Sequence, residues 1–186
     1  EGLKLLLDEM MAEAGVRVLY YTFYAGTLKD GDTVTGGIIE SKSGRQAILA
    51  KTVVDATGDG DVFAAAGAEF EHRSYNIGLV SRIGNLDKVG PEAAKQKPKP
   101  RGLGSATPIP GVNWVNMLGP ETDGLDVAVL TQLEMKHRRF IWENLQKLRK
   151  TPGYEKVSLL ETGPQLGVCI TRTLTGVKTL STDDIK

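Results

Sequence analysis

The residues best suited to chemistry form one short run, Asp55-Ala56-Thr57-Gly58-Asp59-Gly60-Asp61. The small side chains at residues 56–58 would let a flat ligand approach the backbone closely. Gly60 permits a tight turn. Asp59 and Asp61 are expected either to cap a following helix or to accept hydrogen bonds from ligand hydroxyl groups. The run therefore predicts a ligand-binding turn.

Two other interpretations of this run are simpler. Turns between a strand and a helix often carry an aspartate cap in proteins of any function. A calcium loop is also rich in aspartate and glycine, but it needs oxygen ligands at positions one, three, five and twelve. Counting from Asp55, position twelve is Ala66, and counting from Asp59, position five is Phe63. This spacing excludes a calcium loop.

The other reactive or aromatic residues are isolated in the sequence. His72 and His137 have no third ligand at metal spacing, so no metal site is predicted. His137 lies near the apolar side of a predicted helix and is expected to be packed or half-exposed. Cys169 has no partner cysteine and is expected to be a small buried residue. Trp114 and Trp142 are expected to pack in a core or between lobes.

The elements that must position the run follow from periodicity. Apolar residues at spacings of three and four predict a helix over residues 3–14, followed by a strand over residues 16–23. Glycine-containing turns then separate a meander of three strands, at residues 21–28, 33–41 and 46–50. A short strand at residues 52–55 and a helical turn at residues 62–66 flank the run. This is the position at which open α/β sheets bind ligands.

The second half of the chain is less regular. Residues 87–111 hold five of the eight prolines and predict a long surface loop or a boundary between lobes. Its basic residues are expected to form a solvated face, with contact to an anionic substrate as the alternative: Lys95, Lys97, Lys99 and Arg101. An amphipathic helix is predicted over residues 126–150, with strands at 112–118, 157–161 and 168–173.

Composition excludes several classes of protein. The 186 residues are 40% hydrophobic and 25% charged, which is typical of a packed globular protein. Since 23 basic residues balance 23 acidic ones, no nucleic-acid partner is expected. One cysteine fits a reducing compartment, with the cytoplasm as the default. The absence of an apolar stretch of about 18 residues predicts neither a membrane span nor a membrane partner.

The run and its neighbours Val53 and Val54 resemble the second flavin motif of FAD-dependent oxidoreductases related to the glutathione reductase type of fold. More narrowly, they resemble a family whose members read IDATGDGDVAAAAGA. The resemblance extends through the meander and the first helix, and again through residues 163–184, so that it covers residues 1–71 and 162–184. Because a helical pattern is already present at Glu1, the chain is expected to be an internal piece of a longer protein.

The resemblance implies an α/β fold with part of a Rossmann-like FAD/NAD(P)-binding domain of the glutathione reductase type, including the antiparallel β-meander. Residues 1–71 would be the second part of this FAD-binding domain. Residues 72–161 would belong to an α+β substrate-side region, and residues 162–186 would return toward the FAD-binding domain. Residues 56–61 would contact FAD, with Asp59 and Asp61 at ribose or ribityl hydroxyls, and the backbone around Phe23 would flank the adenine.

The implied function is hydride transfer between a small organic substrate and FAD in the full-length protein. His72 and Arg172 are candidate residues on the substrate side, while the catalytic base and the oligomeric state are not predicted. Cys169 stands where the family usually has an arginine. No G-x-G-x-x-G loop follows a strand, so this chain alone is expected to bind FAD weakly or not at all and to be inactive.

The alternative is a non-catalytic lobe that binds a ligand or partner and has no redox activity of its own. The missing glycine loop favours this alternative. A third interpretation is a substrate-side domain produced alone.

Overall fold

The computed structural model describes residues 2–178 and 180–185 and divides into two compact units. The first unit contains the residues up to Glu69 and those from Leu174 onward. The second unit contains Phe70–Thr173. Within the described residues no helix is long and apolar enough to cross a membrane.

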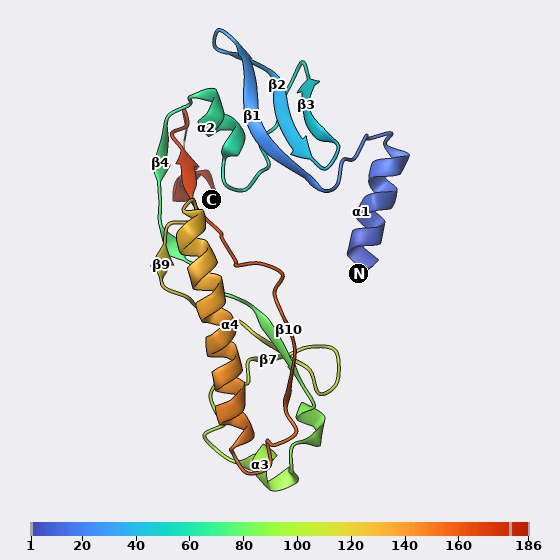
Figure 1. Ribbon diagram of the computed structural model, residues 1–186, viewed down its shortest axis with the longest axis vertical. Coiled ribbons are helices and arrows are strands. Elements are labelled where there is room, and N and C mark those ends of the chain that lie inside the picture. The colour runs from blue at the N-terminus through green and yellow to red at the C-terminus, as the bar shows by residue number, and fades with distance from the viewer. Residues whose placement is uncertain (1, 179, 186) are drawn as a thin grey trace. The chain divides into compact units, whose positions relative to one another are not determined.

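The first unit begins with helix α1, Gly2–Glu13, as the apolar spacing predicts (Figure 1). The strand predicted over residues 16–23 is wrong in its first part, because strand β1 begins only at Thr22. Tyr21 has a positive φ of 56°, which interrupts an extended chain. None of the described residues of α1 is buried.

The antiparallel meander is confirmed. Strands β1 (Thr22–Asp30), β2 (Thr33–Ser41) and β3 (Gly44–Leu49) form a sheet in the order β1-β2-β3. Two-residue loops join them, since Asp30 pairs with Thr33 and Ser41 pairs with Gly44. The sheet thus forms from local pairings, which a short-range sequence pattern can specify.

Helix α2, Asp61–Ala66, follows the meander and ends at Gly67, as predicted. The strand predicted at residues 52–55 is wrong, because these residues adopt no regular secondary structure. An apolar run becomes a strand only when a partner strand satisfies its backbone groups, and no described strand pairs with this one. A short 3₁₀ helix at Thr182–Asp184 also lies in the first unit.

The second unit contains a four-stranded sheet in the order β10-β6-β8-β7. Its strands are β6 (Ser81–Gly84), β7 (Ser105–Ala106), β8 (Asn113–Val115) and β10 (Ser158–Thr162). Two smaller sheets pair β5 (Tyr75–Asn76) with β9 (Glu121–Thr122) and β4 (Phe70–His72) with β11 (Arg172–Leu174). The strand predicted at residues 168–173 is therefore shorter and begins four residues later.

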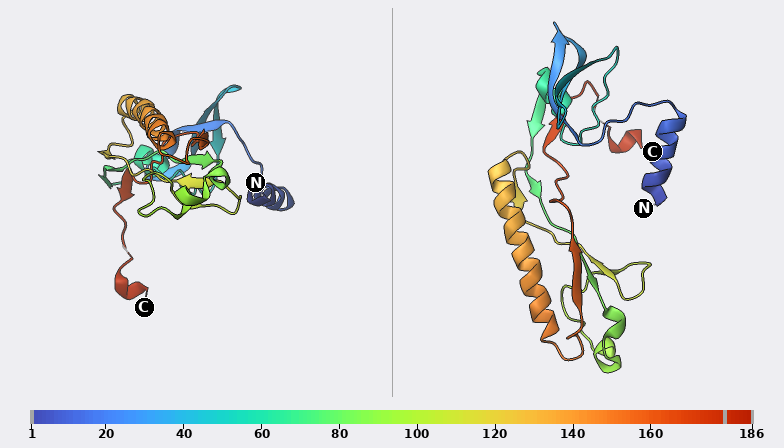
Figure 2. Two further views of the ribbon diagram at one scale, coloured as in Figure 1. Left: turned by 90° about the horizontal axis from the view of Figure 1, so that it is seen from below. Right: turned by 45° about the vertical axis from the view of Figure 1, so that its right-hand side comes forward.

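Helix α4, Val127–Arg149, contributes to both apolar clusters of the second unit and runs beside β10 in Figure 1 and Figure 2. Asp126 caps the helix by accepting hydrogen bonds from the amides of Ala128 and Val129 at 2.9 and 3.0 Å. The buried side of α4 contains five residues: Leu133, His137, Ile141, Leu145 and Leu148. Its four leucine and isoleucine residues pack into two clusters: Leu133 and Ile141 with Ile77, Leu79 and Leu166, and Leu145 and Leu148 with Ile83, Tyr154 and Val157.

The proline-rich segment is more ordered than predicted. A 3₁₀ turn (Leu86–Lys88) overlaps the start of the segment predicted to be a loop, and a short helix, α3 (Pro91–Lys95), lies within it. Proline at the first helical position is compatible with a helix, because no intrahelical partner is lost there. A high proline content therefore does not by itself exclude a helix that begins at Pro91.

Three burial predictions are also wrong. Cys169 is exposed, and Trp114 and Trp142 keep 42% and 52% of their surface accessible. Trp142 follows buried Ile141 by one residue, which turns it about 100° away from the core side of α4. Apolar character alone does not specify which side of an element a residue occupies.

Candidate functional site

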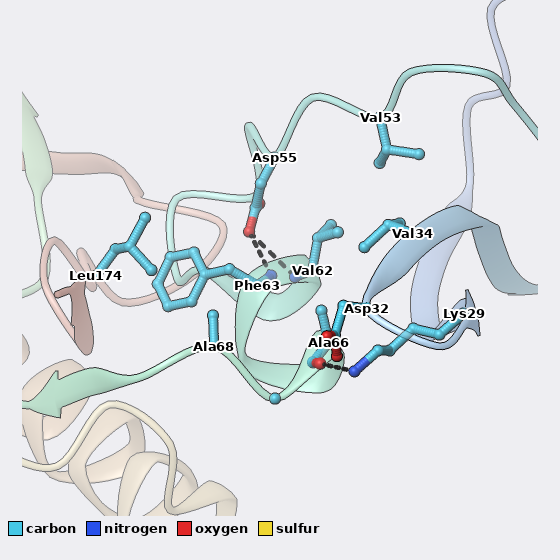
Figure 3. A pocket seen from close by; sticks show the side chains of 11 residues that line it. Lys29, Asp32, Val34, Val53, Asp55, Val62, Phe63, Ala66, Ala68 and Leu174 are labelled. Carbon is cyan, nitrogen blue, oxygen red and sulfur yellow. Dashed lines mark hydrogen bonds between the residues drawn. The ribbon is translucent and has the colours of Figure 1, made fainter. Parts of the chain in front are cut away.

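The 55–61 turn, which comprises residues 55–61 and leads into helix α2, is held by one carboxylate. Oδ1 of Asp55 accepts hydrogen bonds from the amide and hydroxyl of Thr57, at 3.1 and 2.7 Å. Oδ2 accepts from the amides of Val62 and Phe63, at 3.1 and 3.0 Å (Figure 3). Both oxygens of Asp55 are therefore occupied within the turn and the first turn of the helix.

The residue that caps helix α2 is thus Asp55, which lies further from the start of the helix than Asp59 and Asp61 do. Gly60 is the N-cap residue of α2 and offers no side chain, and Thr57 Oγ1 accepts the amide of Asp61 at 3.0 Å. Asp55 and Thr57 accept amide hydrogen bonds at the start of α2, a capping role that the sequence predicted for Asp59 and Asp61. An aspartate six residues before the first helical position is too far away for the usual capping pattern to identify it.

The same hydrogen bonds change the acidity of Asp55. Partial burial alone would raise the pKa of its carboxyl group. The hydrogen bonds from the Thr57 side chain and from the amides of Phe63, Thr57 and Val62 outweigh burial and lower that pKa. The group is therefore held as a carboxylate, the form that can accept all four hydrogen bonds.

Two glycines in the turn have left-handed backbones but different surroundings. Gly58 has a φ of 83°, and a Cβ atom placed there would meet no heavy atom within 4 Å. Gly60 has a φ of 68°, and a Cβ atom there would lie 2.1 Å from the Phe63 ring. Gly60 is therefore needed for packing within the protein, whereas the backbone at Gly58 faces open space that a ligand can enter.

Two contacts tether α2 to strand β1. Thr27 Oγ1 donates to the carbonyl of Val62 at 3.0 Å, and the Lys29 ammonium group donates to the carbonyl of Ala66. Lys29 thereby satisfies a carbonyl at the C-terminal end of the helix, where a positive charge is favourable. These contacts fix the helix, and with it the end of the 55–61 turn, against the meander.

A cavity of about 440 Å³ lies between the meander and α2, as Figure 3 shows. Its apolar wall comes mainly from Val34, Val53, Val62, Phe63 and Leu174. Lys29, Asp32 and Asp55 also line it. Asp55 therefore contributes both to this cavity and to the turn, whereas the predicted adenine neighbour Phe23 does not line it and is 78% exposed.

The two predicted substrate-side residues lie on paired strands. His72 is on strand β4 and Arg172 on strand β11, and both belong to the second unit. His72 Nε2 lies 2.9 Å from Oδ1 of Asp123, which the sequence did not single out. The Arg172 guanidinium lies 5.7 Å from the centre of the Phe70 ring. No group of three or more potential metal-ligating side chains occurs among the described residues.

Comparison with solved structures identifies the class of fold. The chain is similar to BexE, a protein studied for oxidation during BE-7585A biosynthesis, at 14% identity and a TM-score of 0.52, over 96% of this chain and 35% of that one. It is similar to CabE, an aromatic hydroxylase from angucycline biosynthesis, at 16% identity and a TM-score of 0.51, over 93% and 34% of the two chains. The chain thus spans about a third of the length of these proteins.

The sequence comparison is more specific. Residues 1–86 match the family described as FAD dependent oxidoreductase. The matched residues include the meander, the 55–61 turn and α2, so the predicted resemblance to FAD-dependent oxidoreductases is confirmed over this part of the chain. The resemblance suggested for residues 162–184 lies outside the match. No curated protein matches the sequence.

Proposed function

We propose that the 55–61 turn binds part of an FAD cofactor, and that the longer protein containing this chain is an FAD-dependent oxidoreductase. The observation that carries this proposal is the combination of a turn locked from within by Asp55 and open space over the left-handed backbone of Gly58. A rigid backbone without protruding side chains is suited to close approach by a flat cofactor. The family match over residues 1–86 supports FAD as that cofactor.

The residues of the turn fit this role. Ala56, Thr57 and Gly58 are exposed, so their backbone is accessible to a ligand. Asp59 and Asp61 follow at positions from which carboxylates could accept hydrogen bonds from ribose or ribityl hydroxyl groups. The isoalloxazine ring of the cofactor would supply the redox chemistry, by accepting a hydride from an organic substrate. The contribution of this chain is to bind and orient the cofactor.

The packing of the first unit supports its being part of a larger domain. Val62 is the one large apolar residue among its described residues that is buried. Other large apolar side chains remain exposed on α1 and on the segments around the meander, among them Leu3, Leu6, Met10, Tyr20, Phe23, Leu49 and Val54. Burial of one large apolar side chain does not offset the conformational entropy that the chain loses when it becomes ordered. Further polypeptide is therefore expected to cover the exposed side chains.

The competing function is a stand-alone lobe that binds a partner or ligand without redox chemistry. The second unit has the two apolar clusters that a stand-alone lobe needs. The first unit lacks an equivalent cluster among its described residues, and residues 1–69 of this unit make up most of the 1–86 match to the family of FAD-dependent oxidoreductases. These observations favour the oxidoreductase.

The test is the visible absorption spectrum of the purified full-length protein, followed by anaerobic titration with a chemical reductant. The proposal predicts bound flavin bands that bleach on reduction, with about one FAD released per chain on denaturation. A full-length protein that carries no flavin, and takes up none when FAD is added, would overturn the proposal and favour the non-catalytic lobe.

A further inference from the structure

The charges of the chain are unevenly divided between its two units. The second unit, Phe70–Thr173, contains 15 basic and 10 acidic side chains, which gives it a net charge of +5. The first unit carries the opposite excess, with 13 acidic against 8 basic side chains. The net charge of zero for the whole chain therefore conceals a basic second unit. A basic protein surface attracts an acidic partner and speeds its approach.

Helix α4 carries much of this positive charge. Val127–Arg149 and the following residue Lys150 include six lysine and arginine side chains but only two glutamates. One of these glutamates, Glu134, pairs with Arg138. Arg139 and Lys150 form no ion pair among the residues that the structure describes. Cations in the last turn of a helix complement its dipole, whereas Arg139 lies well before the last turn and is not explained in this way.

A stripe of five residues, called the Trp142 stripe below, runs along the side of α4 that faces away from its buried residues. Its members follow one another at spacings of four and three residues and span about 21 Å of the helix: Met135, Arg139, Trp142, Gln146 and Arg149. Met135 and Trp142 keep 65% and 52% of their surface accessible. The stripe therefore places two large apolar side chains and two guanidinium groups on one side of a single helix.

The composition of the Trp142 stripe is that of the centre of a protein interface. Tryptophan, methionine and arginine are enriched in such interfaces, and tryptophan and arginine are prominent among the residues that contribute most of the binding energy. The helix is held by the two apolar clusters beneath it. Arg149 is also held, because its Nε donates to the carbonyl of Glu155 at 3.2 Å. A partner would therefore meet a surface that is already ordered, which lowers the entropy cost of binding.

We infer that the Trp142 stripe is a docking surface for an acidic segment of a partner protein. Trp142 is the apolar anchor, and Arg139 pairs with a carboxylate of the partner, since an arginine without an ion pair is suited to bidentate binding of that group. An anionic membrane fits the stripe less well. A helix that lies in a membrane surface inserts a continuous apolar side, whereas here an arginine separates Met135 from Trp142. The inference does not depend on the cofactor of the proposed function.

The first test asks whether the Trp142 stripe is accessible in the full-length protein. Acrylamide quenching of tryptophan fluorescence, compared between the wild type and Trp142→Phe, isolates the emission of Trp142. This emission should be quenched readily, because the side chain is exposed on α4. An emission that acrylamide does not quench would show that another part of the longer protein covers the stripe, and would overturn the inference.

The second test determines the chemistry of the partner. A displayed library of random peptides of about 20 residues, long enough to follow the stripe as a helix, is selected on the full-length protein at about 0.15 M salt. The selected peptides should carry an excess of aspartate and glutamate around an apolar residue. Trp142→Ala should weaken their binding at least about tenfold, and Arg139→Gln should weaken it and reduce its dependence on salt. Selected peptides without an acidic excess, or with equal affinity for Trp142→Ala and the wild type, would refute the inference.

The matched control is Trp114→Ala, which removes the other tryptophan of this chain. Trp114 lies on strand β8 of the same unit and is 42% exposed. Its replacement should leave peptide binding within about twofold of the wild type. Equal losses in the two tryptophan variants would refute the inference. If Trp142→Ala lowers the thermal midpoint, Arg139→Gln becomes the deciding variant, and unchanged binding in that variant would refute the inference.

A last comparison separates the partner classes. Vesicles that contain phosphatidylserine should bind the wild type and Trp142→Ala equally. Vesicle binding that is lost in Trp142→Ala, with no peptide selected from the library, would assign the stripe to a membrane and overturn the inference. Absence of flavin from the full-length protein would refute the proposed function and leave the docking surface standing, so the two failures are distinguishable.

Discussion

The carboxylate of Asp55 lies 3.0 Å from the amide nitrogen of Phe63, eight residues further along the chain. The side chain of Asp55 thereby connects the start of the 55–61 turn to its end and caps helix α2, which follows the turn. Its four hydrogen bonds replace those that solvent would otherwise supply to the turn. The shape of the proposed cofactor site therefore depends on Asp55 more than on any residue that would contact the cofactor.

Replacing Asp55 by alanine is expected to loosen the start of α2. Loss of a capping carboxylate costs about 1–2 kcal/mol, which corresponds to amide exchange about 5–30-fold faster at Val62 and Phe63. Hydrogen–deuterium exchange of the full-length protein measures this. Asp30→Asn, at the exposed end of β1, is the control. Unchanged exchange at both amides in Asp55→Ala would show that the carboxylate does not hold the helix.

The cap should also make the stability of the first unit depend on pH. The pKa of Asp55 is lowered in the folded protein, so the unfolded chain binds a proton more readily. The stabilisation is complete above the usual aspartate range and is lost as the pH falls through the lowered folded-state pKa. Between about pH 5 and pH 2 the thermal midpoint should fall more steeply in the wild type than in Asp55→Asn. Parallel curves would contradict the assignment.

Gly60 is expected to tolerate alanine less well than Gly58. Both backbones are left-handed, which costs a non-glycine residue about 1 kcal/mol, but only at Gly60 would the new methyl group collide with the Phe63 ring. Gly60→Ala should therefore lower the thermal midpoint clearly more than Gly58→Ala does. Equal losses would mean that the backbone conformation alone, and not the approach of Phe63, requires glycine at position 60.

His137 is expected to be a structural residue of the second unit. It is buried and donates from Nε2 to the carbonyl of Ile77 at 3.0 Å. His137→Ala leaves a cavity and an unpaired buried carbonyl, so the free energy of unfolding should fall by about 2–4 kcal/mol. Urea unfolding followed by tryptophan fluorescence measures this, with exposed Arg139→Ala as the control at about 0.5 kcal/mol or less. Similar losses in the two variants would refute this role.

The sequence predicted the parts of the structure that depend on local patterns. Helix α4 shows an amphipathic period and a capping residue, and the meander has two-residue turns, so both were found nearly at their true ends. The strands predicted over residues 16–21 and 52–55 failed because a strand needs a partner, and pairing is not a property of the apolar run itself.

The candidate sites were predicted only in part for the same reason. The turn was recognised from its small residues, but the role of Asp55 depends on how the chain folds back over eight residues. His72 was selected without Asp123, since nothing in a single sequence relates residues that lie 51 positions apart. The properties of both sites depend on contacts between residues that are far apart in the sequence, and the local sequence around one residue does not reveal such contacts.

The proposed site places FAD against the backbone at Gly58, and the dissociation constant of FAD from the full-length protein tests this most directly. Gly58→Val puts a branched side chain in the open space, and Gly102→Val is the matched control, because Gly102 has a φ of 84° and equally open surroundings in the second unit. We expect FAD to bind at least about tenfold more weakly to Gly58→Val and unchanged to Gly102→Val. Wild-type affinity in Gly58→Val would contradict the placement of FAD at this turn.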